Sequence, residues 1–454
     1  MQLFDSLSKT LKTIDKKELK IYACGVTVYD NIHIGHARLY LCLDVLLRLF
    51  DFKNIKYKYV RNITDVDDKI INKAIKENKS FKTVASKYTT QMQKDFNDLG
   101  LINPQSEPKA TDSIDEIINF INKLISKNYA YKSSNGDILF DVSKFKNYGE
   151  LSKRDLENQV TQLRVNSSKD NTSDFVLWKV DNIDEPTWDS PFGKGRPGWH
   201  IECSAMICKE LGETIDIHAG GEDLKFPHHE NEIAQSEACF NKSLSNVWMH
   251  VGHLNIKGEK MSKSLGNFIK VKDILTNYHK DIVRLSLLTA HYKKQQDFTI
   301  KQMHQADKLL FNIHRLSVKP NSDSHKLNTL ESHYFLKALM NDLNTPIAIE
   351  QFHKIISKIE HEKNTNDALV MKNDLYLMAN ILGIKSDDNQ KTSFFRFGLN
   401  SDEIIKIENL LNKREQARSD KNWILADEIR DKLCEMNVSV YDDTNKSWWS
   451  RTII

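Results

Sequence analysis

The first hundred residues alternate between strand-like and helix-like patterns, and this alternation constrains the fold more than any other feature. Residues 21–29 are rich in β-branched and aromatic side chains, and residues 55–60 alternate in polarity, as strands do. Residues 34–50, 67–75 and 84–99 carry apolar side chains at helical spacing. A strand, helix, strand, helix order predicts an α/β fold with a parallel sheet.

The pattern changes twice along the remaining chain. Residues 106–185 break the alternation and include a polar run at 165–174, which we interpret as an exposed loop within an inserted module. The strand pattern returns at residues 215–221 and runs into a glycine turn. No glycine occurs between Gly266 and Gly383, and apolar residues recur there at helical spacing, which predicts a helical bundle.

Charge is unevenly distributed along the chain. The net charge of +3 is too small to indicate a nucleic-acid partner by itself. Residues 251–330, however, contain 14 basic and 6 acidic residues, an excess that favours a phosphate-bearing partner. No run of 18 apolar residues and no secretory signal pattern is found, and six cysteines do not make a disulfide framework. We therefore expect a cytoplasmic protein that does not bind membranes.

Residues 228–232, His-His-Glu-Asn-Glu, are the first candidate site. Pro227 precedes them, so a helix is expected to begin here, with His228 and Glu232 on one face. Imidazole and carboxylate suit a zinc ion, but most zinc sites also use thiolate or more imidazole. The pair alone is compatible with a metallohydrolase or with part of a larger site.

Two further motifs indicate phosphate binding. His33, Gly35 and His36 follow the first predicted strand and begin the first helix, where free N–H groups attract anions. Lys260 and Lys263 lie in a Ser-containing loop at residues 260–264, from which two ammonium groups can stabilise developing charge. Solvent-facing histidines and an ordinary basic loop are the simpler alternatives. No P-loop motif occurs, so a P-loop ATPase is not indicated.

The pairing of these motifs resembles the signature of class I aminoacyl-tRNA synthetases. Segments 22–30, 60–69, 195–206, 226–232 and 421–433 are similar to cysteinyl-tRNA synthetase, and the resemblance covers nearly the whole chain. It implies a cysteine–tRNA ligase that activates L-cysteine with ATP and Mg²⁺ and transfers it to the 3′ end of tRNA(Cys).

The resemblance also implies the roles of particular residues. One Zn²⁺ per chain would bind the substrate thiol, and it would be held by Cys24, Cys203, His228 and Glu232. We expect His229 to act behind these ligands, and we interpret Cys42, Cys208, Cys239 and Cys434 as inert thiols. The catalytic residues would be His33, His36, Lys260 and Lys263; cysteine would contact Gly25, Thr64 and Trp199; and the adenosine of ATP would contact His218, Gly220 and Asp223. Glu222 departs from the small or neutral residue frequent in this family.

The implied domains are as follows: a Rossmann-like catalytic domain in two halves (1–105 and 186–250), an inserted connective module (106–185), a KMSKS-loop and stem-contact region (251–305), a helical bundle (306–390) and a C-terminal anticodon-binding domain (391–454). In the last, Trp448, Trp449 and Arg451 would stack on unpaired bases, or the tryptophans would form a packed pair. We expect a monomer.

Two other functions are the alternatives to a cysteine–tRNA ligase. A cysteine ligase acting on a small amine, as in mycothiol synthesis, would keep the zinc ligands and both phosphate motifs but lacks a full anticodon-binding end. A catalytically dead tRNA-binding protein would have lost His33, His36, Lys260 or Lys263, all of which are present.

Overall fold

The centre of the molecule is a four-stranded parallel sheet. The computed structural model describes residues 1–153, 173–180, 186–256, 258–261, 266–320, 326–362, 364–385, 399–442 and 447–451. The sheet has the order β10–β9–β3–β4, and all three pairings are parallel. Its strands are β3 (Glu18–Ala23), β4 (Lys56–Arg61), β9 (Ile215–Gly221) and β10 (Ser245–Val251). The predicted α/β fold with a parallel sheet is therefore confirmed.

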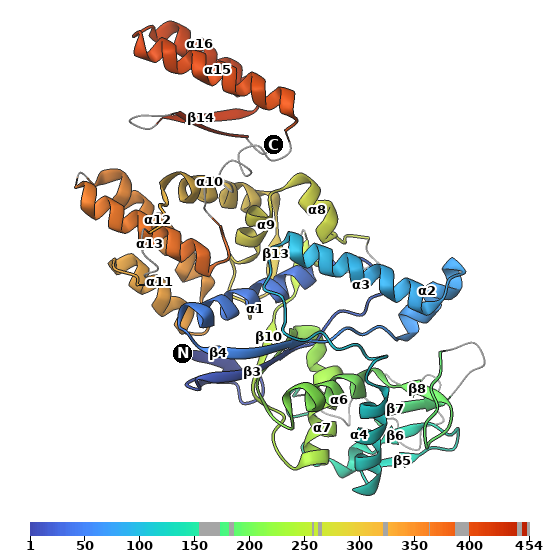
Figure 1. The fold of residues 1–454 in the computed structure, drawn as a ribbon. Helices are drawn as coiled ribbons and strands as arrows, with labels where there is room; N and C mark the ends of the chain where they lie inside the picture. The colour runs from blue at the N-terminus through green and yellow to red at the C-terminus, as the bar shows by residue number, and fades with distance from the viewer. Residues whose placement is uncertain are drawn as a thin grey trace.

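Helices cover both faces of this sheet (Figure 1). Ile21 packs in the cluster that contains the first helix, α1 (Ile34–Phe52), whereas its neighbour Tyr22 packs with the helices on the other face, α6 (Trp199–Leu211) and α7 (His228–Phe240). This division follows from the two-residue period of a strand. Two further helices, α2 (Asp68–Glu77) and α3 (Phe81–Asp98), follow β4.

The chain leaves the predicted first strand earlier than expected. The sequence pattern predicted a strand over residues 21–29, but β3 ends at Ala23. A Cβ atom at Gly25 would lie 1.7 Å from the backbone oxygen of Asn62. The backbone at Gly25 thus passes too close to the neighbouring segment for a side chain, and Cys24 is the first residue beyond the strand.

The inserted module has its own antiparallel sheet of order β5–β6–β7–β8. It contains α4 (Ile114–Ser126), β5 (Ala130–Lys132), β6 (Ile138–Phe140), the short helix η1 (Val142–Lys144), β7 (Phe175–Val180) and β8 (Gly195–Pro197). Its sheet therefore extends past residue 185, where the sequence pattern placed the end of the insertion. Residues 165–172 of the expected loop lie outside the described residues.

Residues 260–264, which we call the lysine loop, begin in a small sheet of order β12–β11–β13. Its strands are β11 (Leu254–Ile256), β12 (Glu259–Lys260) and β13 (Gln296–Phe298). An N-terminal hairpin, β1 (Gln2–Asp5) and β2 (Thr10–Thr13), packs beside β10. The short helix η2 (Glu222–Lys225) connects β9 to α7.

Helices make up most of the remaining chain, as the glycine-free span predicted. They are α8 (Val271–Asn277), α9 (Lys280–Leu287), α10 (Ile300–Leu316), α11 (Leu330–Met340), α12 (Thr345–His361) and α13 (Thr365–Ile381). The C-terminal part consists of α15 (Ser401–Ser419), α16 (Trp423–Glu435), β14 (Val438–Asp442) and β15 (Ser447–Arg451), and it lies beyond α10, at the opposite end from the inserted sheet (Figure 1). None of the described helices is long and apolar enough to cross a membrane.

Candidate active site and metal centre

A cleft of about 360 Å³ opens at the carboxyl ends of the central strands. In parallel α/β sheets this edge is where ligands usually bind. The cleft brings together side chains that are far apart in the sequence. Its lining includes Cys24, Gly25, His33, His36, Trp199, Asp223, His253 and Met261. Residues from both predicted phosphate motifs and one predicted metal ligand therefore share one cavity.

His33 and His36 cap the helix that they begin. His33 is the N-cap of α1: its Nδ1 accepts a hydrogen bond from His36 N at 3.3 Å, and His36 Nδ1 accepts one from His33 N at 3.3 Å. The two rings stack, with centroids 3.6 Å apart. Because Nδ1 accepts in each ring, the proton of the neutral imidazole lies on Nε2. Nε2 is then the atom that can donate to a phosphate oxygen.

Of the three residues expected to contact cysteine, two line the cleft and one is buried. Gly25 and Trp199 line the cleft, and Gly25 N donates to Asn62 Oδ1 at 2.7 Å. Thr64 is 2% exposed and accepts a hydrogen bond from Asn62 Nδ2. Asn62 was not singled out from the sequence, since an amide near a strand end carries no local signal.

The four expected zinc ligands meet beneath the cleft. Cys24, Cys203, His228 and Glu232 each offer a donor atom, and these atoms lie within 4.8 Å of one another. All four residues are 3% exposed or less. Cys24 follows β3, Cys203 lies on α6, and the other two share one face of α7.

The charges of this group depend strongly on each other. Burial opposes a charged His228, but Glu232 and Cys203 outweigh it and raise the pKa of His228 to about 10. Burial likewise opposes ionisation of Glu232, yet His218 and His228 hold its pKa well below the ordinary value. A hydrogen bond with Cys24 lowers the pKa of Cys203 to about 6. Together, the four side chains therefore hold protons that a bound metal cation could replace.

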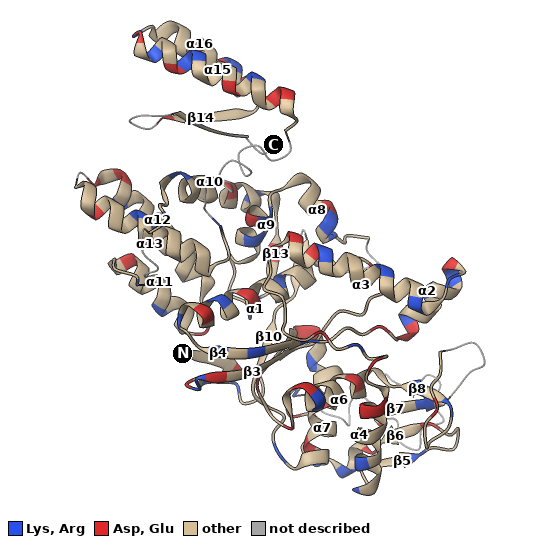
Figure 2. Cartoon of the chain, in the orientation of Figure 1, with Lys and Arg blue, Asp and Glu red and all other residues tan. Residues whose placement is uncertain are grey.

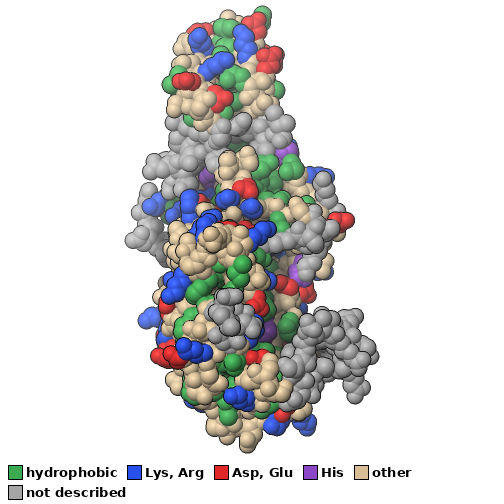
Figure 3. Space-filling model, turned by 90° about the vertical axis from the view of Figure 1, so that its right-hand side faces the viewer, with side chains coloured by type: hydrophobic (Ala, Val, Ile, Leu, Met, Phe, Trp, Pro, Cys, Tyr) green, Lys and Arg blue, Asp and Glu red, His purple; other side chains and the backbone are tan. Residues whose placement is uncertain are grey.

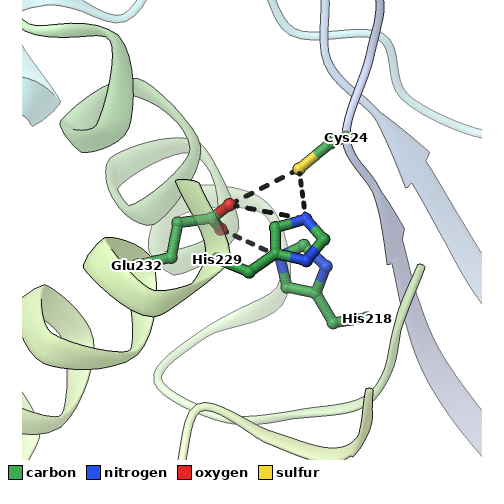
Figure 4. Close-up of side chains that lie close together, drawn as sticks. All are labelled: Cys24, His218, His229 and Glu232. Carbon is green, nitrogen blue, oxygen red and sulfur yellow. Dashed lines mark hydrogen bonds and ion pairs between the residues drawn. The ribbon is translucent and has the colours of Figure 1, made fainter. Parts of the chain in front are cut away.

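A second possible donor set overlaps the first (Figure 4). It combines Cys24 and Glu232 with His218 and His229. His229 Nε2 lies 3.3 Å from Cys24 Sγ, and His218 Nε2 lies 2.8 Å from Glu232 Oε2. His229 Nδ1 is 2.8 Å from Nε2 of His250, a strand residue that the sequence analysis did not single out.

The expected adenosine residues fall in two places. Asp223 lines the cleft, next to Gly221. His218 is fully buried and stacks on Trp248, and it is not among the described residues that line the cleft. A Cβ atom at Gly220 would lie 2.5 Å from His229 Cε1, so this glycine makes room for the buried ring. Lys225 forms an ion pair with the unusual Glu222 and offsets its charge.

The lysine loop is described in part. Lys260 ends β12, which pairs with β11, while Lys263 lies outside the described residues. Met261 is 8% exposed and lines the cleft. A Cβ atom at Gly35 would lie 3.0 Å from Met261 Cε, so the beginning of the loop rests on the first motif.

In the C-terminal part, Trp449 is 7% exposed and packs in a cluster with residues of α15 and α16. This packing favours the alternative of a structural tryptophan over a base-stacking one. Trp423, at the start of α16, is 58% exposed. Nothing in the sequence singles out Trp423, because exposure on a helix cannot be read from one tryptophan.

Two family models match the chain. One, described as the tRNA synthetases class I (C) catalytic domain, matches residues 10–308; the other, the cysteinyl-tRNA ligase anticodon binding domain, matches residues 406–449. The cysteine–tRNA ligase of Pasteurella multocida is 42% identical over 461 residues, covering 99% of this chain and 100% of that protein. The cysteine–tRNA ligase of Legionella pneumophila (strain Corby) is 40% identical and covers 99% of both chains.

Solved structures show the same fold at low identity. Methionyl-tRNA synthetase of Mycobacterium tuberculosis, in complex with methionyl-adenylate, has a TM-score of 0.57 at 12% identity and covers 86% of this chain and 95% of that one. A LeuRS–tRNA–LeuAMS complex of Agrobacterium radiobacter has a TM-score of 0.58 at 11% identity and covers 84% and 85%. Together, the family models and the full-length relatives show that the chain belongs to the cysteine–tRNA ligases, which are class I aminoacyl-tRNA synthetases.

Proposed function

We propose that Cys24, Cys203, His228 and Glu232 hold one zinc ion that selects cysteine by its thiol. The observation that carries this proposal is that Cys24 belongs both to the buried donor set and to the wall of the cleft that contains His33 and His36. A thiolate-rich zinc ion supplies a site that binds a thiolate far better than a hydroxyl, which separates cysteine from serine.

The two overlapping donor sets are not equivalent for this task. The set with Cys203 supplies two sulfur ligands, whereas the set with His218 and His229 supplies one. With zinc on the sulfur-rich set, His218 and His229 would hydrogen-bond the ligands from behind and fix their orientation. This is the role that the sequence analysis expected for His229.

Around this pocket, cysteine activation would proceed as an in-line displacement. The cysteine carboxylate attacks the α-phosphorus of ATP, and the bond to pyrophosphate breaks, giving cysteinyl-adenylate. Nε2 of His33 and His36 would donate to the reacting phosphate, while Lys260, Lys263 and Mg²⁺ would stabilise the leaving pyrophosphate. The terminal hydroxyl of tRNA(Cys) then displaces AMP. Asp223, which lines the cleft beside the glycine turn, would accept hydrogen bonds from the ribose.

The tRNA would lie along the basic face that contains α3 and α8. Figure 2 shows Lys together with Asp on both helices, and Figure 3 shows basic side chains gathered at mid-height on that face. Lys94 and Lys272 are exposed members of α3 and α8. The lysines there would neutralise phosphates of the tRNA.

At the C-terminal end, the exposed Trp423 is the better candidate for stacking on an anticodon base, because Trp449 is buried.

The domain division proposed from the sequence keeps its order, with the boundary of the inserted module moved to include β8 (Gly195–Pro197). Residues 251–305 would form the KMSKS-loop and stem-contact region, 306–390 the bundle, and 391–454 the anticodon-binding domain.

One experiment tests the two-step reaction on the intact chain. Cysteine-dependent exchange of pyrophosphate into ATP is measured first, followed by transfer of labelled cysteine to tRNA(Cys). We expect exchange without tRNA and transfer with it. Exchange that is never followed by transfer would favour the small-amine ligase, and a lack of exchange would contradict the proposed activation chemistry. Serine replaces cysteine as the matched control and should support little exchange.

A further inference from the structure

Arg38 is a buried arginine two residues after His36 on α1. It is 1% exposed. Its Nη1 donates to the backbone oxygens of Gly252 and His253 at 2.6 and 3.1 Å, and its Nη2 donates to those of Lys294 and His291 at 2.7 and 3.2 Å. All four acceptors are main-chain carbonyls, and they belong to two separate segments.

These two segments lead directly into the small sheet that contains Lys260. Gly252 and His253 precede β11, whose Asn255 pairs with Lys260 of β12. The segment 291–294 precedes β13, which pairs with β11 on the other side. One guanidinium therefore joins the helix of the first phosphate motif to both lead-in segments of the sheet that presents the second motif.

The two segments also pack so closely against each other that Gly252 leaves no room for a side chain. Gly252 N donates to Tyr292 O at 2.8 Å, and a Cβ atom at Gly252 would lie 2.6 Å from Lys294 O. Gly252 and His253 line the cleft as well. A shift of the contact between residues 252–253 and 291–294 would therefore move the cleft wall and the strand that ends at Lys260 together.

We propose that Arg38 is a positioning residue for cysteine activation, which sets the distance between the His33–His36 helix end and the strand that ends at Lys260. The inference rests on the proposed role of Lys260. Arginine suits this task because its planar fork has several N–H donors that reach two segments at once, whereas the three N–H donors of lysine lie on one nitrogen.

The first test compares Arg38→Lys with Arg284→Lys in cysteine-dependent pyrophosphate exchange. Arg284 is the control: it is fully buried, forms an ion pair with Asp44, and donates to the backbone oxygens of Leu99, Gly100 and Leu382, none of which lines the cleft. Because a displacement of ~1 Å can lower a rate ~100-fold, we expect Arg38→Lys to lose roughly that factor in kcat per folded molecule. The KM for cysteine should stay unchanged, since the zinc ligands lie on other segments. Arg284→Lys should lose stability but keep kcat.

A double-mutant cycle with Lys260→Ala shows whether Arg38 affects kcat by positioning Lys260 or by disturbing the fold in general. If Arg38 acts by placing Lys260, Arg38→Lys should cause little further loss of kcat in the Lys260→Ala background. Fully additive losses would overturn the proposal, as would a wild-type kcat for Arg38→Lys or equal kcat losses for the two arginine variants.

If Arg38→Lys does not fold, Gly252→Ala is the second variant: its Cβ pushes the two segments apart while Arg38 keeps its charge and its N–H donors. It should show the same loss of kcat and the same non-additivity with Lys260→Ala. A normal kcat for Gly252→Ala would then overturn the proposal. A failure of the proposed function is distinguishable, because it would appear as absent exchange in the unmodified chain.

Discussion

At the scale of single residues, Cys203 and Cys208 show how one helix can hold a ligand and an inert thiol. Both lie on α6, but Cys203 belongs to the donor set and Cys208 belongs to neither set found among the described residues. We predict that Cys203→Ser loses bound zinc and cysteine activation together, by more than the 10- to 100-fold that loss of an outer partner costs. Metal content and pyrophosphate exchange are measured in parallel.

Cys208→Ser is the matched control and should keep both properties. Full zinc content with normal cysteine activation in Cys203→Ser would contradict the assigned ligand set.

Asp281 is a buried carboxylate that should lower stability at neutral pH. It is 0% exposed, and neither carboxylate oxygen has a hydrogen-bond partner among the described residues. Burial outweighs the nearby Lys280 and Arg284 and raises its pKa from 3.8 to about 6. The folded chain thus binds this proton more tightly than the unfolded chain, so stability falls as pH rises from 3.8 to about 6.

We predict that Asp281→Asn is more stable than wild type at pH 7.5, by up to about 3 kcal/mol, and that the gap narrows toward pH 4. Thermal and urea unfolding midpoints measured across this range test the prediction. Asp273→Asn, at an exposed carboxylate of α8, is the control and should show no such trend. A gap for Asp281→Asn that does not change with pH would count against the assignment.

The candidate site was only partly derivable from residue patterns. His228 and Glu232 could be paired from helical spacing, and α7 confirms that they share a helix. Cys24 and Cys203 come from distant segments, so no local spacing joins them; they entered through family resemblance. His250 carries no signal in the sequence, because a histidine in a buried strand looks like any core residue until its neighbours are placed.

At the scale of elements, α16 presents an aromatic side chain to solvent at its first residue. Base stacking contributes ~1–3 kcal/mol, so Trp423→Ala should raise the KM for tRNA roughly 10- to 100-fold. Pyrophosphate exchange should not change, because the cleft is remote from α16.

Ile424→Ala is the control for Trp423→Ala, since Ile424 is 77% exposed but has no aromatic ring. Equal effects of the two variants on the KM for tRNA would argue against stacking. Trp449→Ala, in contrast, should destabilise the C-terminal part by about 3–5 kcal/mol, because it removes a packed core side chain.

Element boundaries show where local patterns stop being informative. The periodicity of residues 34–50 predicted α1 within two residues of its observed end at Phe52. The first strand was predicted too long, because the residues beyond Ala23 are β-prone and yet turn away. That turn is imposed by the close approach of Gly25 to Asn62, a tertiary contact that propensity does not report.

At the scale of the whole molecule, the C-terminal part rests on the bundle through an aromatic pair. Phe311 of α10 and Tyr441 of β14 have ring centroids 3.8 Å apart. The parallel sheet and the glycine-free helical region were predictable because each has a repeating pattern. How the C-terminal part docks was not, since it depends on contacts between segments more than one hundred residues apart.

We predict that a chain ending at residue 385 keeps cysteine-dependent exchange but loses kcat/KM for tRNA by roughly 100-fold, the effect of losing about 3 kcal/mol of contacts. Substitution of Phe311 by serine in the shortened chain serves as a control for the newly exposed surface. A shortened chain that charges tRNA normally would remove the proposed role of the C-terminal domain.

Metal removal tests whether zinc selects cysteine by its thiol. The intact chain is treated with a chelator, its zinc content is determined, and pyrophosphate exchange is measured with cysteine and with serine before and after zinc is returned. We predict one zinc per chain, loss of cysteine-dependent exchange on removal, and recovery of exchange with cysteine but not with serine when zinc is restored. A zinc-free chain that still activates cysteine and still rejects serine would contradict this prediction.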